Sequence, residues 1–191
     1  MIRKIYAVGL MAVATGSIAA PVTYTIDPAH TYPAFEADHF GGLSIWRGKF
    51  KTTSGKVVLD LAARTGEVDV TVQTASVDFG NAEMDKHAKA ADMFDVAVFP
   101  TATYKGRISK WNGDAPAEVD GQFTLKGVTR PLKLTIHSFL CKPNPLTRKE
   151  TCGADASATF MRDAYNMDYG KSLGFKMDTK LLISIEAEKK N

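Results

Sequence analysis

The sequence predicts an all-β domain with one short helix. Apolar and polar residues alternate along several segments, residues suited to turns separate these segments, and only one stretch has the spacing of a helix. Alternation that leaves one polar face is typical of antiparallel sheets, whereas buried parallel strands are apolar on both faces. The strands are therefore expected to be antiparallel.

The alternation is strictest at residues 67–73, where Val68, Val70 and Val72 share one face. Further alternating segments lie at 57–61, 118–125, 132–136 and 181–185. Turns are predicted at Ser54-Gly55, Arg64-Thr65-Gly66, Asn112-Gly113-Asp114 and Lys126-Gly127. The spacing predicts roughly eight to ten strands. About eight strands suffice to close a barrel around side chains or one small ligand. The pattern alone also allows an open two-sheet sandwich.

One helix is predicted between residues 82 and 93. Asn81 can cap it, and Glu83 and Asp85 suit the positive end of the helix dipole. Met84, Ala88 and Ala91 form a narrow apolar stripe, so the helix is expected to lie outside the sheet or to close one end of it. Residues 166–174 have a weaker pattern and are predicted to form a loop.

Residues 1–19 are predicted to be a cleaved signal peptide. Arg3 and Lys4 precede an apolar run from 5 to 14, and small residues lead up to a cleavage site after Ala19. The apolar run is too short to span a hydrocarbon layer of about 30 Å. We therefore expect an exported chain whose residues 20–191 form a single domain with no integral membrane span.

The charge balance argues against a nucleic-acid partner. The chain has 24 basic and 21 acidic residues, and removal of Arg3 and Lys4 leaves 22 basic residues. A nearly neutral protein lacks the concentrated basic surface that nucleic acids require.

The cysteines predict one disulfide. Cys141 and Cys152 are the two cysteines of the chain, and an exported protein meets an oxidising environment that favours pairing. Closing so short a loop stabilises a fold by about 2–3 kcal/mol in the chain-entropy model. A redox-active pair is disfavoured because the spacing is not Cys-x-x-Cys.

Three segments carry a family resemblance. Residues 24–50, 85–100 and 121–134 resemble, in order and spacing, the YceI-like family of polyisoprenoid-binding proteins. The resemblance implies a lipocalin-like, eight-stranded antiparallel β-barrel with an elongated apolar cavity, and a periplasmic location. It also implies an isoprenoid lipid or isoprenoid quinone as the ligand and no other cofactor. The chain departs from the family at Asn166, where glycine usually follows Arg-x-x-aromatic, although asparagine tolerates positive φ well.

The inward faces predict a ligand cavity. Small residues at Ala102, Gly121 and Ala187 are expected to leave free volume, although a barrel can also fill its interior with side chains. The candidate ligand-binding residues are Phe35, His39, Trp46, Arg47, Val68, Val70, Val72, Phe94, Tyr104, Phe123, Leu134 and Ile183.

Two polar candidates allow alternative interpretations. His39 shares a strand face with Phe35, so it can meet a ligand head group or simply belong to the wall. Arg47 can bind a pyrophosphate or quinone oxygen with its planar guanidinium, or form a surface ion pair. The four histidines lack the spacing of a metal site.

The sequence does not predict an enzyme. Residues 42–46 lack the second glycine of a nucleophile elbow, and Asp85 and Asp92 do not form an evident catalytic pair. Three functions remain as hypotheses: a periplasmic lipid carrier, an enzyme acting on the head group of an isoprenoid lipid, and an envelope stress protein with incidental lipid. The sequence leaves open which isoprenoid is bound and whether two chains associate as a homodimer.

Overall fold

The computed structural model describes residues 20–190, so the predicted signal peptide lies outside the described residues. The strands are β1 (Val22–Ile26), β2 (Tyr32–His39), β3 (Ser44–Phe50), β4 (Thr53–Asp60), β5 (Thr65–Gln73), β6 (Val77–Asp78), β7 (Thr101–Asn112), β8 (Ala115–Leu125), β9 (Val128–Pro143), β10 (Glu150–Met161) and β11 (Asp178–Lys189). The helices are α1 (Ala82–Ala88) and the 3₁₀ turns η1 (Thr74–Ser76), η2 (Arg162–Tyr165) and η3 (Lys171–Leu173).

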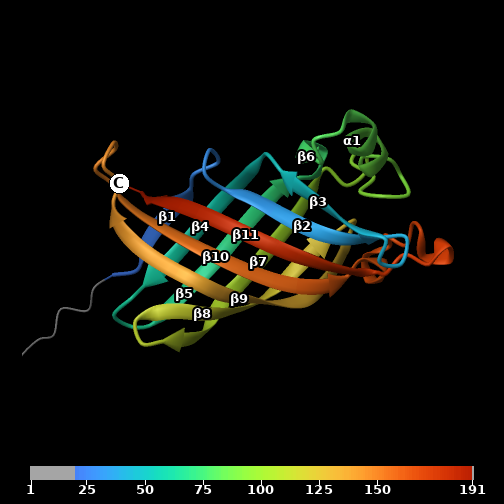
Figure 1. The fold of residues 1–191 in the computed structure, drawn as a ribbon. Helices are drawn as coiled ribbons and strands as arrows, with labels where there is room; N and C mark the ends of the chain where they lie inside the picture. The colour runs from blue at the N-terminus through green and yellow to red at the C-terminus, as the bar shows by residue number, and fades with distance from the viewer. Residues whose placement is uncertain (1–19, 191) are drawn as a thin grey trace, which may run out of the picture.

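Eight of the strands form a closed antiparallel barrel. They pair in the order β1–β4–β5–β7–β8–β9–β10–β11, and β11 closes the ring by pairing with β1 (Figure 1). Closure satisfies the backbone groups that an open sheet would expose along its edges. The predicted barrel is therefore confirmed, and the sandwich alternative is wrong.

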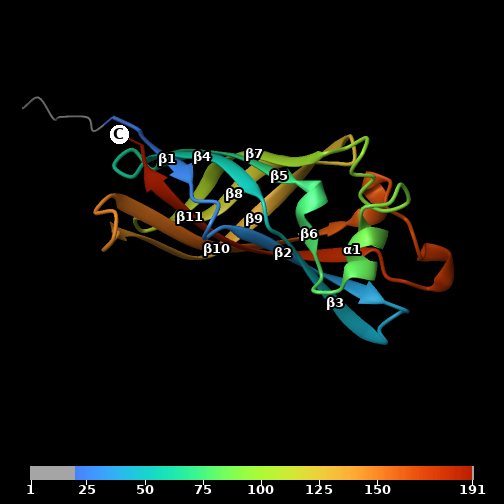
Figure 2. The same ribbon diagram turned by 90° about the horizontal axis from the view of Figure 1, so that it is seen from above.

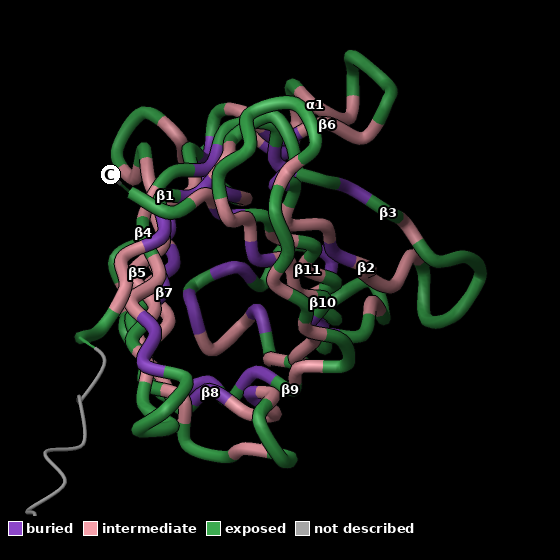
Figure 3. The backbone as a smooth tube through the Cα atoms, turned by 90° about the vertical axis from the view of Figure 1, so that its left-hand side faces the viewer, coloured by how far each residue is buried: buried purple, intermediate pink, exposed green. Residues whose placement is uncertain are grey.

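The remaining strands lengthen the barrel at one end. β11 pairs with β1 near Ala187 and with β2 from Thr179 to Ser184. β1 and β2 therefore lie one after the other along the same edge of β11. β3 pairs with β2, and β6 pairs with β3. The tip of the β2–β3 hairpin and α1 lie at the end opposite the described chain termini (Figures 1 and 2). Figure 3 looks along the barrel from the end with the termini.

The predicted helix begins where expected but ends early. The side chain of Asn81 accepts hydrogen bonds from the Glu83 and Met84 amides at 3.1 and 3.2 Å, which confirms the cap. α1 ends at Ala88, five residues before the predicted end at Met93. The Phe94 amide donates to the Ala88 carbonyl at 3.0 Å, because the chain turns back and buries Phe94 in the barrel.

The predicted loop at residues 166–174 contains the short turn η3 but no α-helix or strand. Asn166 adopts φ 59° and ψ 32°, which is the left-handed region that a glycine would occupy most easily. Asparagine reaches this conformation at modest cost. The turn is therefore kept despite the departure from the family pattern.

The predicted disulfide is confirmed. Cys141 and Cys152 are bonded, with their Cα atoms 4.0 Å apart, and they face each other across β9 and β10. The bond therefore fastens two neighbouring strands of the barrel near their shared hairpin.

The prediction that Gly121 leaves free volume is wrong. A Cβ atom at this position would lie 2.4 Å from the Cζ atom of Tyr104, so the tyrosine ring already fills the space. Gly48 makes room for Phe35 in the same way, because a Cβ there would lie 2.6 Å from the phenylalanine ring. These glycines let aromatic rings pack flat against the barrel wall.

Within residues 20–190, no helix combines the length and the apolar character needed to cross a membrane.

Candidate functional site

The barrel encloses an inner chamber of about 170 Å³. Its wall is built from the inward positions of the regular strands, where alternation places every second side chain inside. Seven of the predicted ligand-binding residues line it: Val68, Val70, Val72, Tyr104, Phe123, Leu134 and Ile183. Cys152 also belongs to the lining, so the disulfide lies beside the inner chamber.

The two tyrosine hydroxyl groups of the inner chamber are hydrogen-bonded to protein atoms. The Tyr104 hydroxyl lies 2.9 Å from the Leu132 carbonyl oxygen and 3.1 Å from that of Val119. The Tyr24 hydroxyl donates to Glu150 Oε1 at 2.5 Å. Burial raises the pKa of both phenols, so they stay neutral. The chamber therefore offers apolar surface to a ligand.

A second cavity, the mouth chamber, has a volume of about 250 Å³ and lies toward α1 and the β2–β3 hairpin. Four more of the predicted residues line it: Phe35, His39, Trp46 and Phe94. Irregular segments complete its wall through Met84 of α1 and through Met167, Tyr169 and Phe175 of the segment between β10 and β11. The mouth chamber is thus formed by residues far apart in the sequence.

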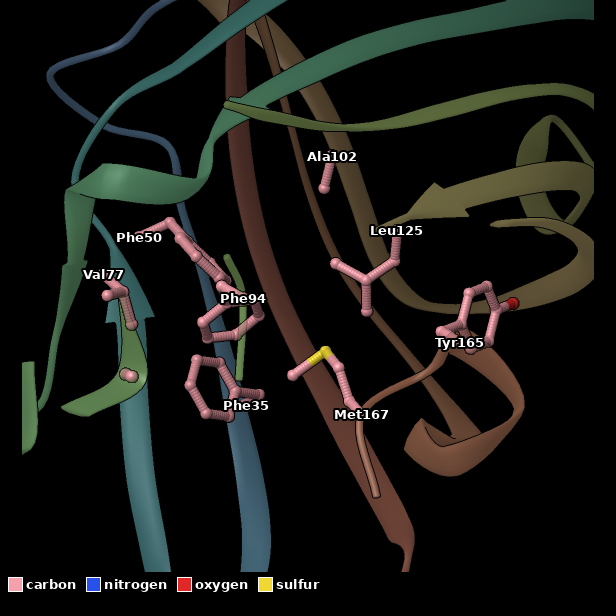
Figure 4. Close-up of a cluster of buried hydrophobic side chains, with 9 residues drawn as sticks. Phe35, Phe50, Val77, Phe94, Ala102, Leu125, Tyr165 and Met167 are labelled. Atoms are coloured by element: carbon pink, nitrogen blue, oxygen red, sulfur yellow. The ribbon is translucent and has the colours of Figure 1, made fainter. Parts of the chain in front are cut away.

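Aromatic rings lie where the two chambers adjoin. Phe50, Phe123 and Leu181 line both of them. The rings of Phe50 and Phe94 lie 5.3 Å apart between centroids and pack edge to face, with Phe35 beside them (Figure 4). The resemblance implied one elongated cavity. The two chambers adjoin and share part of their lining, and these rings pack against one another where the chambers meet.

The mouth chamber also contains a buried cation. Arg162 is only 6% exposed, and its guanidinium donates to the Met167 and Tyr169 carbonyl oxygens at 2.8 Å each. Burial lowers the pKa of this guanidinium. Sequence reasoning did not single out Arg162 as a candidate. The signal was present, because Arg162 continues the inward face of β10 two positions after Phe160.

Thr179 adds an unpaired hydroxyl to the same chamber. The residue is 5% exposed and lines the mouth chamber. Its Oγ1 atom is buried and has no hydrogen-bond partner within the described part of the chain. Buried hydroxyls in proteins normally have a partner, so the unpaired Thr179 hydroxyl is an exception in this wall.

Comparison with known proteins agrees with this architecture. The model of the YceI-like domain matches residues 24–188. A UPF0312 protein of Ectopseudomonas mendocina is 33% identical over 175 residues, which is 90% of each chain.

The chain belongs to the YceI-like family. A UPF0312 protein of Shewanella baltica is 36% identical over 137 residues, covering 68% of this chain and 71% of the relative. Among solved structures, BcnA of Burkholderia cenocepacia superposes with a TM-score of 0.68 at 22% identity, covering 85% of this chain and 99% of BcnA. A domain from Saccharophagus degradans described as polyisoprenoid binding has a TM-score of 0.63 at 13% identity, covering 88% and 99% of the two chains. These two structural likenesses support the YceI-like fold.

One predicted residue of this YceI-like barrel lies outside both chambers. Arg47 Nε donates to Glu36 Oε1 at 2.8 Å, and its side chain is 68% exposed. It follows Trp46 on β3, and successive side chains of a strand point to opposite faces. Because Trp46 lines the mouth chamber, Arg47 points outward. Its interpretation as a ligand-binding residue is wrong, and the alternative of a surface ion pair is correct.

His39 lies at the mouth chamber among aromatic rings. Its ring centroid lies 4.4 Å from that of Phe40, 5.1 Å from Trp46 and 5.3 Å from Phe175. The position is compatible with both interpretations from the sequence, a wall residue and a head-group contact.

Asp38 joins the two irregular segments of the mouth. One carboxylate oxygen accepts from the Gly41 amide at 2.8 Å and from the Lys176 amide at 2.9 Å. These backbone hydrogen bonds, with that of Lys176 the larger contribution, lower the pKa of the Asp38 carboxyl group. An ionised Asp38 therefore fastens the β2–β3 hairpin to the segment before β11.

Within residues 20–190, the structure contains no cluster of three or more His, Cys, Asp or Glu side chains that could hold a metal ion.

Proposed function

We propose that this YceI-like protein binds a long isoprenoid lipid, or an isoprenoid quinone, inside its barrel after export to the periplasm. The observation that carries the proposal is the pair of adjoining chambers, of about 170 and 250 Å³, whose linings are mostly apolar. Together they fall within the range of roughly 300–1,000 Å³ that is typical of small-molecule sites. An apolar chain suits the inner chamber because both tyrosine hydroxyl groups there are already hydrogen-bonded to protein atoms.

The expected affinity is sufficient for carriage. Large ligands gain at most about 0.3 kcal/mol per non-hydrogen atom, so a chain of about forty carbons is limited to roughly 12 kcal/mol. Binding at even part of this limit would retain the lipid through purification. A chain that occupies both chambers would pass Phe50, Phe123 and Leu181, which line both of them. The polyisoprenoid-binding description of the Saccharophagus domain, which shares the fold, also supports the proposal.

Lipid binding can be tested by titration of lipid-stripped protein. Geranylgeraniol and a straight-chain saturated alcohol with the same number of carbons are compared by calorimetry. The proposal predicts saturable binding of one geranylgeraniol per chain and weaker binding of the straight chain. Absence of saturable binding, or equal affinity for both, would contradict an isoprenoid site.

The same samples distinguish a carrier from an enzyme. After long incubation with the protein, the lipid is extracted and its mass is measured. A carrier returns the lipid unchanged, whereas a new product would favour the alternative of an enzyme acting on the head group.

Export is tested by the N-terminal sequence of the protein isolated from the producing bacterium. Cleavage after Ala19 predicts that the mature chain begins at Ala20 and is released with the periplasmic fraction. A chain that still begins at Met1 and stays with the cytosol would contradict export.

A further inference from the structure

Four large apolar side chains at the outer end of the mouth are more than half exposed to solvent. They are Phe40, Leu43, Ile45 and Leu173. The first three belong to the β2–β3 hairpin and the fourth to η3. These two segments are in contact, because a Cβ atom at Gly41 would lie 3.0 Å from the Gly174 carbonyl oxygen. We name the four side chains the apolar rim.

The apolar rim lies in segments without charge. Residues 40–46 of the hairpin and residues 172–175 beside them contain no Asp, Glu, Lys or Arg. The ammonium group of Lys176 lies at the edge of this region, because a Cβ atom at Gly42 would lie 3.7 Å from its Nζ atom. At a phospholipid surface, apolar side chains enter between the head groups and a lysine beside them reaches the phosphates. The chemistry of the rim therefore matches such a surface.

The apolar rim is continuous with the mouth chamber. Phe40 and Leu173 line the chamber and also face solvent. The Phe40 ring packs against Phe175, another lining residue, with 4.8 Å between the ring centroids. Apolar surface thus leads from the rim into the chamber. Every CH₂ group of a prenyl chain is unfavourable in water, so a lipid would enter or leave most easily where this surface meets a membrane.

The opposite end of the barrel gives an internal comparison. The β9–β10 hairpin lies there, beside the C-terminal end of β11, and its Leu146 is almost fully exposed. Leu146 lines neither chamber, and charged residues follow it at positions 148–150. Single exposed leucines are common on protein surfaces, whereas several gathered at one place mark an interaction site. The interaction site is therefore at the mouth end.

The shape of the apolar rim favours a bilayer over a protein partner. Two chain turns at one end of the molecule form it (Figures 1 and 2). A stable interface between proteins needs a broader face, because it buries about 800 Å² on each partner. Side chains at the tips of turns can enter a bilayer without a matching surface.

We propose that the apolar rim docks on a phospholipid bilayer, so that a prenyl lipid passes between the bilayer and the mouth chamber without crossing water. This inference rests on the proposed lipid-binding function. It adds the partner surface and the end of the barrel through which the lipid moves.

Vesicle flotation tests docking on the lipid-stripped full chain, because it requires no bound lipid. The vesicles contain equal parts of phosphatidylethanolamine and phosphatidylglycerol. Leu43→Ser combined with Ile45→Thr removes two rim side chains that line neither chamber. This rim variant should bind the vesicles about tenfold more weakly than wild type, because less apolar surface is buried. Its affinity for geranylgeraniol should be unchanged.

The matched control is Leu146→Ser combined with Leu140→Thr. Both leucines are more than half exposed, belong to the β9–β10 segment and line neither chamber. The control should float with the vesicles as well as wild type does. Lys176→Gln should weaken binding to these vesicles about fivefold, the effect of one basic residue at an anionic surface, and should not change binding to pure phosphatidylcholine.

Delivery of the lipid gives a second measurement. Protein loaded with geranylgeraniol is mixed with increasing amounts of vesicles, and the rate at which the lipid leaves the protein is recorded. Docking predicts a rate that rises with vesicle concentration and is several-fold lower in the rim variant. A rate that does not depend on vesicle concentration would overturn transfer through docking.

The outcomes separate docking from the function on which it rests. Wild-type protein that does not float, or a rim variant that floats equally well, would overturn docking and leave lipid binding intact. Dimers that disappear in the rim variant, together with no flotation, would assign the rim to a second copy of the chain and overturn docking. Failure to bind geranylgeraniol would overturn the proposed function, and the passage of lipid with it, even if the protein still floated.

Discussion

The inner chamber and the mouth chamber differ in how they are built and in what they offer a ligand. Regular strands enclose the inner chamber, its tyrosine hydroxyl groups are hydrogen-bonded to protein atoms, and the Cys141–Cys152 disulfide lies beside it. Irregular segments complete the mouth chamber, which contains buried Arg162 and the unpaired Thr179 hydroxyl. The inner chamber offers a ligand apolar surface, whereas the mouth chamber also has polar side chains in its lining.

The largest effect is expected from blocking the inner chamber. Ile183→Trp places a large ring in the lumen, so prenyl-lipid affinity should fall by about a hundredfold or more, because the chain loses its apolar contacts. The melting temperature should change little if the interior is a ligand cavity. A packed core would instead be overfilled at a cost of about 1–3 kcal/mol.

Leu182→Trp is the control for this change. Leu182 is the next residue of β11 and is 36% exposed on the outer face, so the same ring there should leave both affinity and stability unchanged. A destabilised Ile183→Trp variant, together with no lipid binding by the wild type, would contradict the cavity.

The second effect concerns the disulfide beside the inner chamber. Reduction of Cys141–Cys152 should destabilise the protein by about 2–3 kcal/mol and lower the melting temperature by several degrees. Denatured, unreduced protein should contain almost no titratable thiol. A double variant, Cys141→Ser with Cys152→Ser, should melt at the lower temperature with or without reductant. Two reactive thiols per wild-type chain would refute the bond.

A smaller effect is expected at the mouth in acid. Folding lowers the pKa of Asp38, so the folded state binds fewer protons than the unfolded chain near the ordinary value of about 3.9. The stabilisation is complete above that pH and is lost as the pH falls through the lowered pKa. The protection factors of the Gly41 and Lys176 amides, which are exchange rates corrected for the intrinsic effect of pH, should therefore fall below about pH 4.

Asp38→Asn separates this effect from general acid unfolding. The asparagine oxygen accepts hydrogen bonds but does not titrate in this range. The variant should lose the acid dependence at those two amides. Equal acid dependence in the variant and the wild type would show that Asp38 does not hold the mouth together.

The smallest effect is expected from Arg47→Ala. Arg47 is exposed and pairs with Glu36 on the outer face, and exposed ion pairs contribute about 0–1 kcal/mol. Lipid affinity should therefore not change, and the melting temperature should shift by a degree or two at most. A clear loss of lipid affinity would show that Arg47 does belong to the binding site.

The two chambers also differ in how far the sequence predicts them. Alternation placed Val68, Val70, Val72 and Ile183 inside the barrel, and all four line the inner chamber. Regular strands make such predictions reliable, because each inward position follows from its neighbours two residues away. The same rule did not reveal that the Tyr104 ring covers Gly121, because cross-strand packing depends on register that one sequence does not display.

The mouth was less predictable. Phe94 reaches it because α1 ends early and the chain turns back, which the periodicity of residues 82–93 did not indicate. Arg162 follows the last residue of β10, where the alternating pattern gives way to η2. Arg47 was misplaced because its chemistry, rather than its position next to Trp46, suggested a ligand contact.

The most direct test of the account is the content of the barrel as it leaves the cell. Wild-type protein and Ile183→Trp are purified gently from periplasmic extract, and their organic extracts are analysed by mass spectrometry. The account predicts about one intact prenyl lipid per wild-type chain, and little or none in the variant. Repeated wild-type preparations without prenyl lipid, or equal amounts in both proteins, would contradict it.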